Sequence, residues 1–161
     1  MSDRELRQQL AQLLSASQAH MDLQEAAENF PPQAYNLRPP HCAYTFWHLL
    51  EHIRICQWDI LEYIRAEVYR ELRFPDDYWP AIDAVTGEEG WLQTLTAIAA
   101  DTRALTEIVL DESNDLYAPL KHSGQSGHHL LREALIVADH NAYHLGEFAI
   151  LRSVVGAFTR E

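Results

Sequence analysis

The sequence is poor in glycine, with six residues in 161, and its seven prolines are concentrated between apolar stretches. Four long stretches remain in which apolar residues recur at spacings of three and four, the pattern of amphipathic helices. No alternation of apolar and polar residues persists long enough to indicate a strand. The sequence therefore predicts an all-α fold, an antiparallel four-helix bundle in which residues 1–161 form a single domain.

Long apolar runs are also missing. The N-terminal residues MSDRELRQQL lack the apolar core of a secretion signal, and no stretch approaches the roughly 20 apolar residues of a membrane span. We therefore expect a cytoplasmic protein without a membrane partner. Cys42 and Cys56 are the two cysteines, and they form no CxxC pair, so we expect both to be reduced thiols.

Basic residues are few. Twelve lysines and arginines face twenty-four acidic residues, which gives a formal net charge of −12. This charge would repel both a nucleic-acid backbone and an anionic membrane surface. Nucleic acid is therefore disfavoured as a partner, and a small molecule is the expected one.

The four predicted helices are separated by polar or proline-rich loops. A proline-rich connector at 31–41 follows the first helix, and Thr86 with Glu89 suggests a capping box at the start of the third. The helices are expected at about Asp3 to Glu28, Tyr44 to Glu71, Thr86 to Asp111 and His128 to Val155.

Two histidines in the last predicted helix favour a metal site. His140 and His144 are four residues apart, which stacks both imidazoles on one helix face. At 100° per residue, Glu133 and Glu147 fall in the same narrow polar column, and apolar residues flank it on both sides. Buried polar groups need partners, so a shared metal ion would satisfy this column.

A third ligand has to come from a neighbouring helix. The second predicted helix offers His52, which flanks its apolar stripe, and His48, which lies further round as a fourth ligand or an orienting group. Glu133 and Glu147 are candidates for orienting the imidazoles. The competing interpretation makes these histidines hydrogen-bonded structural residues and the glutamates solvated charges.

The remaining candidates receive structural interpretations. Cys56 lies one turn from His52, but it is interpreted as a small buried hydrophobe and not as a ligand. Four aromatic residues are interpreted as core and loop anchors in preference to a substrate cage: Tyr44, Tyr78, Trp79 and Trp91. No spacing argument supports a role for the other five histidines: His20, His41, His122, His128 and His129.

Three segments of the sequence resemble a known family, and together they extend over nearly the whole chain. They are WHLLEHIRICQWDILEYI, DDYWP and LLREALIVADHNAYHLGEFAILR. The chain resembles the DinB-like superfamily, also called the YfiT-like metalloenzymes. The resemblance implies a four-helix bundle, often homodimeric, whose metal is held by His52, His140 and His144. His48 is a departure, because related sequences commonly carry a glutamate or another residue there.

The resemblance also implies a range of chemistry. Some members are thiol-dependent S-transferases, hydrolases or isomerases that act on adducts of low-molecular-weight thiols. The first hypothesis is therefore an enzyme with a divalent ion, Zn²⁺ or Ni²⁺ before Fe or Mn, held by three neutral imidazoles beside an open position. A thiol S-transferase is favoured and a metal-assisted hydrolase comes second. The sequence offers no obvious dedicated base, and Glu147 and His48 are the candidates for that role.

Two other classes of function stay open. The first is a non-catalytic, stress-related protein that sequesters a metal or a small molecule, which a fourth ligand from His48 would favour. The second is a metal-free structural bundle whose histidines satisfy one another and nearby carboxylates. Metal content would discriminate the second from the other readings.

Overall fold

The computed structural model describes residues 2–16 and 18–157, and in these ranges it contains helices but no strand. The all-α prediction is therefore confirmed. Within the same ranges, no helix is both long and apolar enough to cross a membrane. Four long helices form the bundle: α1 (Asp3–Ser15), α3 (Phe46–Arg65), α4 (Glu88–Leu110) and α5 (Leu130–Val154). The connections contain the short helix α2 (Leu23–Ala27) and three 3₁₀ turns: η1 (Pro32–Ala34), η2 (Asp76–Tyr78) and η3 (Gly124–Ser126).

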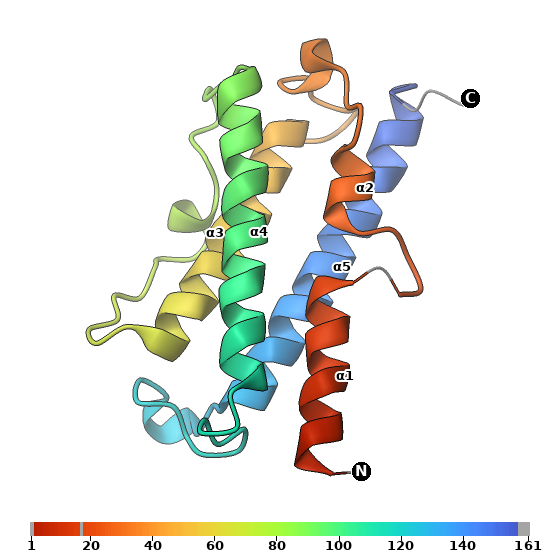
Figure 1. The fold of residues 1–161 in the computed structure, drawn as a ribbon. Coiled ribbons are helices and arrows are strands. Elements are labelled where there is room, and N and C mark those ends of the chain that lie inside the picture. Colours follow the sequence, from red (N-terminus) through yellow and green to blue (C-terminus); the bar gives the residue numbers. More distant parts are fainter. Residues whose placement is uncertain (1, 17, 158–161) are drawn as a thin grey trace.

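Helix α3 packs on both α4 and α5, while α1 packs mainly on α4. Figure 1 shows that α3 and α5 run in opposite directions, as do α1 and α4. Helices α3 and α4 run the same way, because the connection 66–87 crosses back along the bundle between them. The α3–α5 pair, which carries the predicted ligands, is thus antiparallel.

The first predicted helix is interrupted. One helix from Asp3 to Glu28 is wrong, since α1 ends at Ser15 and the backbone at Ala16 is extended. Asp22 then begins α2 with a capping box, in which its carboxylate accepts from the backbone N–H of Glu25 and the Glu25 carboxylate accepts in return. This second helix start replaces the continuation of the first helix.

The second predicted helix is shorter than expected. It ends at Arg65 instead of Glu71, and the next residue is extended. The chain folds back beyond it, because the hydroxyl of Tyr69 donates to Asp59 of α3 at 2.9 Å. The backbone carbonyl immediately after the helix is bound by His122 Nε2 at 2.8 Å. Tertiary contacts thus end this helix.

The predicted capping box of Thr86 and Glu89 does not form. Helix α4 begins with Gly87 as its N-cap, which has no side chain to accept a hydrogen bond. The Thr86 hydroxyl instead donates to the carbonyl of Gly87, and the Thr86 N–H donates to Asn36 Oδ1 in the proline-rich connector. A contact with a distant segment therefore displaces the local cap.

The core has a polar layer between two apolar clusters. One cluster lies where α3 and α4 begin and consists mainly of aromatic residues, namely Phe30, Tyr35, Phe46, Trp91 and Phe148. The other lies where α3 and α4 end and is aliphatic, with Leu10, Leu61, Leu105, Val109, Leu130 and Val137. Between them, Gln57 of α3, Thr102 of α4 and Asn141 of α5 are joined by hydrogen bonds. In the sequence, Asn141 directly follows the predicted ligand His140, and Gln57 lies five residues after His52. The two apolar clusters pack on either side of this polar layer.

Candidate metal centre

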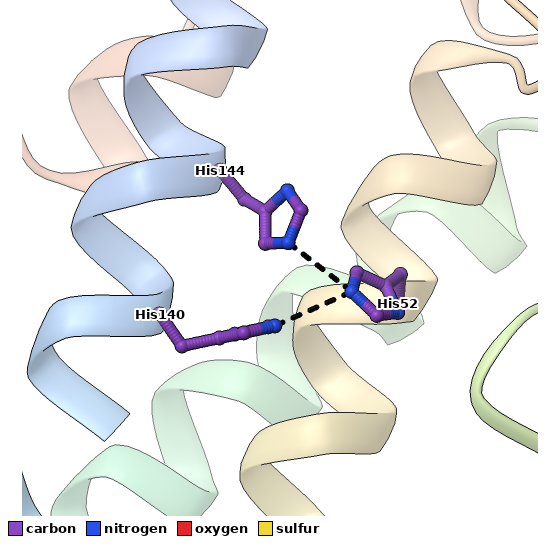
Figure 2. A group of neighbouring side chains, drawn as sticks. All are labelled: His52, His140 and His144. Atoms are coloured by element: carbon purple, nitrogen blue, oxygen red, sulfur yellow. Dashed lines mark hydrogen bonds between the residues drawn. The ribbon is translucent and has the colours of Figure 1, made fainter. Parts of the chain in front are cut away.

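Three histidines, here called the histidine triad, converge between α3 and α5. Figure 2 shows His140 and His144 pointing from α5 toward His52 on α3. Nε2 of His52 lies 3.2 Å from Nε2 of His144 and 3.3 Å from Nε2 of His140. The four-residue spacing turns both α5 rings toward α3. The structure thus brings together the residues predicted as ligands, and metal binding by them stays a prediction.

Two triad rings are fixed through their outer nitrogens. Nδ1 of His52 lies 2.9 Å from the carbonyl oxygen of Tyr78, and Nδ1 of His144 lies 2.8 Å from Glu147 Oε2. A carbonyl or carboxylate oxygen only accepts, so each Nδ1 carries the proton. In a neutral ring the remaining nitrogen, Nε2, then has a free lone pair. This is the arrangement usual for metal-bound histidines.

The inward-facing nitrogens of the triad fit a shared cation. Two unprotonated Nε2 atoms 3.2 Å apart, in His52 and His144, have no hydrogen between them and repel each other. Zn–N bonds of about 2.0–2.1 Å would separate neighbouring ligand nitrogens by about 3.3–3.4 Å in tetrahedral geometry and by about 2.8–3.0 Å in octahedral geometry. The three candidate ligand atoms lie within 4.8 Å of one another. The donor set therefore suits a divalent ion that binds imidazole.

Burial favours the neutral, metal-binding form of two triad rings, those of His52 and His140. Desolvation lowers the pKa of His52, and it lowers the pKa of His140 to about 4, with the neighbouring His144 and His52 adding to the effect. Metal ions compete with protons for imidazole lone pairs, so a low pKa leaves the nitrogens available near neutral pH.

An aromatic wall supports the triad. The ring of Trp79 stacks on His52, with centroids 3.9 Å apart and planes 4° apart. Tyr44 stacks on Trp79 in turn, and its hydroxyl donates to Glu147. Sequence reasoning had placed both aromatics as core or loop anchors, whereas the structure places them at the site. Trp91 is 2% exposed and belongs to the core, as predicted.

The two candidate glutamates have different surroundings. Glu147 contacts His144 directly, as the polar column suggested. Glu133 is buried, receives a hydrogen bond from Arg132 at 2.6 Å, and lies 3.6 Å from His128. It shares the angular position of the triad but lies seven residues before His140, about 10 Å along the helix. The structure therefore gives Glu147, and not Glu133, an orienting contact with the triad.

His48 and Cys56 flank His52 on α3 without completing the ligand set. Nε2 of His48 is bonded to the carbonyl oxygen of Ala84 at 2.8 Å, and within the described ranges His48 is not part of the metal-binding group. The sulfur of Cys56 lies 3.8 Å from Nε2 of His52. Burial, and then Asp59, raise the pKa of this thiol to about 12, so it stays protonated. A thiolate is the form that binds metals, which agrees with leaving Cys56 out.

A large cleft in the described part of the chain does not have the triad histidines in its lining. It has a volume of about 1380 Å³ and is lined mainly by residues of α1, α2, α4 and α5, with Ile53 from α3. At the triad, the side chains of His144 and Glu147 are 12% and 26% exposed.

The sequence model of the DinB superfamily matches residues 15–148. The matched range contains η2, α3 and the first part of α5, and thus all three triad histidines and Trp79. Neither the curated proteins nor the solved structures gave a match. Since the family model extends over most of the sequence and includes the candidate site, the chain belongs to the DinB superfamily.

Proposed function

We propose that this protein is a divalent-metal-dependent enzyme that transfers a group to or from the sulfur of a low-molecular-weight thiol. The observation that carries the proposal is the triad itself, three imidazoles whose Nε2 atoms converge while the Nδ1 protons of two are held by protein oxygens. Three protein ligands beside an open position are typical of catalytic sites, whereas structural sites usually have four.

We assign Zn²⁺ or Ni²⁺ to the site before Fe or Mn. Imidazole suits the first two ions, and the site lacks the carboxylate ligands that Mn²⁺ favours, since Glu147 is already bonded to His144 and to Tyr44. The bound ion supplies positive charge that favours loss of a proton from a thiol or a water molecule near neutral pH.

The candidate bases are both occupied by structural contacts. Glu147 uses one oxygen for Tyr44 and the other for His144, and His48 is bonded to the carbonyl of Ala84. We therefore propose that Glu147 orients His144, and that the thiol proton passes to water. The thiol sulfur then attacks an electrophilic carbon, and the leaving group departs with the bonding electrons.

An assay with two substrates tests this function. Zn²⁺- and Ni²⁺-loaded protein is incubated with cysteine or glutathione and 1-chloro-2,4-dinitrobenzene, and formation of the S-aryl product is followed by absorbance. The proposal expects a rate that requires thiol and metal, is lost in His52→Ala and is kept in His122→Ala. A rate with neither requirement would contradict it.

Metal-assisted hydrolysis is the second candidate, because the same open position can activate water. Hydrolysis of p-nitrophenyl acetate without thiol, dependent on the metal and on His52, would favour it. Metal binding with no turnover in either assay would favour a sequestering protein. The four-ligand version of that alternative loses support, because His48 bonds to Ala84 and is not part of the group.

The homodimer implied by the family resemblance stays a proposal. Two large apolar residues of α5, Tyr143 and Ile150, are 71% and 66% exposed and lie seven residues apart on one face. Covering them with a second copy would remove apolar surface from water. Analytical ultracentrifugation of wild type and Tyr143→Ser tests this: a dimer that dissociates in the variant supports it, and a monomeric wild type contradicts it.

A further inference from the structure

The three rings of the triad are not fixed in the same way. His52 and His144 each have an oxygen acceptor at Nδ1, from Tyr78 and Glu147. His140 has its Nε2 directed at His52, and no comparably close oxygen accepts from its Nδ1 within the described ranges. A metal-bound histidine usually donates its outer N–H to an acceptor, which sets the ring orientation. One of the three rings therefore lacks a fixed acceptor.

The next residue, Asn141, has a carboxamide of fixed orientation. Gln57 donates through Nε2 to the carbonyl oxygen of Ile98 at 2.8 Å, and a carbonyl can only accept. The Oε1 of Gln57 must therefore point the other way, where it accepts from Asn141 Nδ2 at 2.7 Å. The Asn141 NH₂ group is thus committed to Gln57, and Oδ1 has to be its free end.

This free oxygen needs a donor. Oδ1 of Asn141 is shielded from solvent and has no partner within hydrogen-bond distance in the part of the chain that the structure describes. Buried acceptors without a donor are rare, because the group gives up its hydrogen bonds to water. The Asn141 side chain acts to raise the pKa of His140, against the larger lowering by burial, as an acceptor near the ring does.

The geometry points to Asn141 as a positioning residue of the metal centre, whose Oδ1 accepts the Nδ1–H of His140 when a metal ion holds Nε2. This inference rests on the proposed function, because it needs a metal at the triad. An N–H without an acceptor and a buried acceptor without a donor stand on consecutive residues. Rotation of the His140 ring toward a shared ion would pair them.

The pairing would connect the metal to three helices. His140 would be fixed by Asn141 on α5, which is held by Gln57 on α3, which is held by Ile98 on α4. Its acceptor would be a neutral amide, whereas His144 has a carboxylate. A carboxylate strengthens the basicity of an imidazole more than an amide does, so His140 would be the weaker donor of the two.

The test follows the imidazole N–H protons of Zn²⁺-loaded, ¹⁵N-labelled protein by NMR, with Zn²⁺ stoichiometry measured first. Three Nδ1–H protons are expected to exchange slowly with water, including that of His140. Binding of Zn²⁺ with rapid exchange at His140 alone would overturn the role of Asn141 and leave the proposed function standing. No binding of Zn²⁺ would overturn both.

Variants supply a second measurement. Asn141→Leu removes the acceptor at similar size, and we expect loss of the protected His140 proton and a Kd for Zn²⁺ raised about 10–100-fold. Asn141→Asp keeps an oxygen acceptor, and a stronger one, so it should bind Zn²⁺ at least as tightly as wild type. Thr102→Val is the matched control, because Thr102 contacts Gln57 in the same layer without serving His140. An equal rise in Kd in Asn141→Leu and Thr102→Val would contradict the inference, and an unchanged Kd in Asn141→Leu would too.

Discussion

Histidines gather in two regions of this molecule. The triad lies between the middle parts of α3 and α5, and a second group, His122, His128 and His129, lies around η3, at the end of the bundle where α5 begins. In the second group each ring has its own protein partner. His122 binds a backbone carbonyl, His128 lies 3.4 Å from the Tyr63 hydroxyl, and His129 Nδ1 accepts from the N–H of Arg132 at 3.2 Å.

The difference between the regions lies in where the lone pairs point. The rings near η3 form separate contacts that cap α5 and anchor the loop after α3, so their nitrogens do not meet. The triad turns three Nε2 atoms toward one point and directs two of its protons outward. A metal site therefore depends on convergent lone pairs, and a local abundance of histidine is not enough.

The largest expected difference between the two histidine regions is in bound metal, when histidines are removed from one region or from the other. We expect His52→Ala and His140→Ala/His144→Ala to reduce bound metal from about one ion per chain to near zero, because two or fewer imidazoles bind weakly. His122→Ala and His128→Ala should keep the metal. Elemental mass spectrometry of the dialysed proteins measures this, and equal loss in both groups would break the comparison.

Metal removal should lower the melting temperature of the wild type. An ion at 100 times its Kd stabilises the folded state by about 2.7 kcal/mol. In a domain of this size that corresponds to about 5–10 °C. Calorimetry with and without a chelator gives the shift, and His52→Ala serves as the control that should show none. A shift of the same size in the variant would place the stabilising ion elsewhere.

The two glutamates of the polar column on α5 should differ in their effect on the affinity for Zn²⁺. Glu147→Gln weakens the acceptor for His144, and we expect a Kd for Zn²⁺ about 10–100-fold higher. Glu133→Gln should leave the Kd unchanged, because Glu133 pairs with Arg132. Competition with a chromophoric chelator measures both values. A larger rise in Kd in Glu133→Gln than in Glu147→Gln would contradict this, because it would show that a shared helix face matters more for Zn²⁺ affinity than the hydrogen bond to His144.

The smallest expected effect belongs to the second histidine group. His129 caps α5, and His129→Ala should cost about 1 kcal/mol of unfolding free energy, as the loss of an N-cap does. Chemical denaturation measures the loss, and the metal content should remain that of the wild type. Loss of metal together with stability would link regions that the structure keeps separate.

The triad could be predicted because its evidence is local. The spacing of His140 and His144 fixes their shared face, and the apolar stripe of α3 places His52 beside it. Trp79 could not be found in this way, since it lies in the connection 66–87 and reaches His52 only after the chain crosses back along the bundle. The DDYWP segment supported the family resemblance, but the sequence alone gave its tryptophan, Trp79, no role at the metal site.

Helix ends were harder to predict than helix faces. The break after Ser15 contains neither proline nor glycine, so composition gave no warning of the second helix start at Asp22. The early end at Arg65 depends on Tyr69 reaching Asp59, a contact that exists only in the folded chain. Local periodicity fixes which residues face inward, while tertiary hydrogen bonds decide where a helix stops.

X-ray absorption at the Zn edge of the purified, Zn²⁺-loaded protein tests the central claim most directly. The account predicts about one ion per chain, surrounded by three imidazole nitrogens at about 2.0–2.1 Å and at least one further light atom from solvent or substrate. A sulfur neighbour at about 2.3 Å would bring Cys56 into the site, and a fourth imidazole would bring in His48. Either result, or failure of the protein to bind any ion, would contradict an open three-histidine centre.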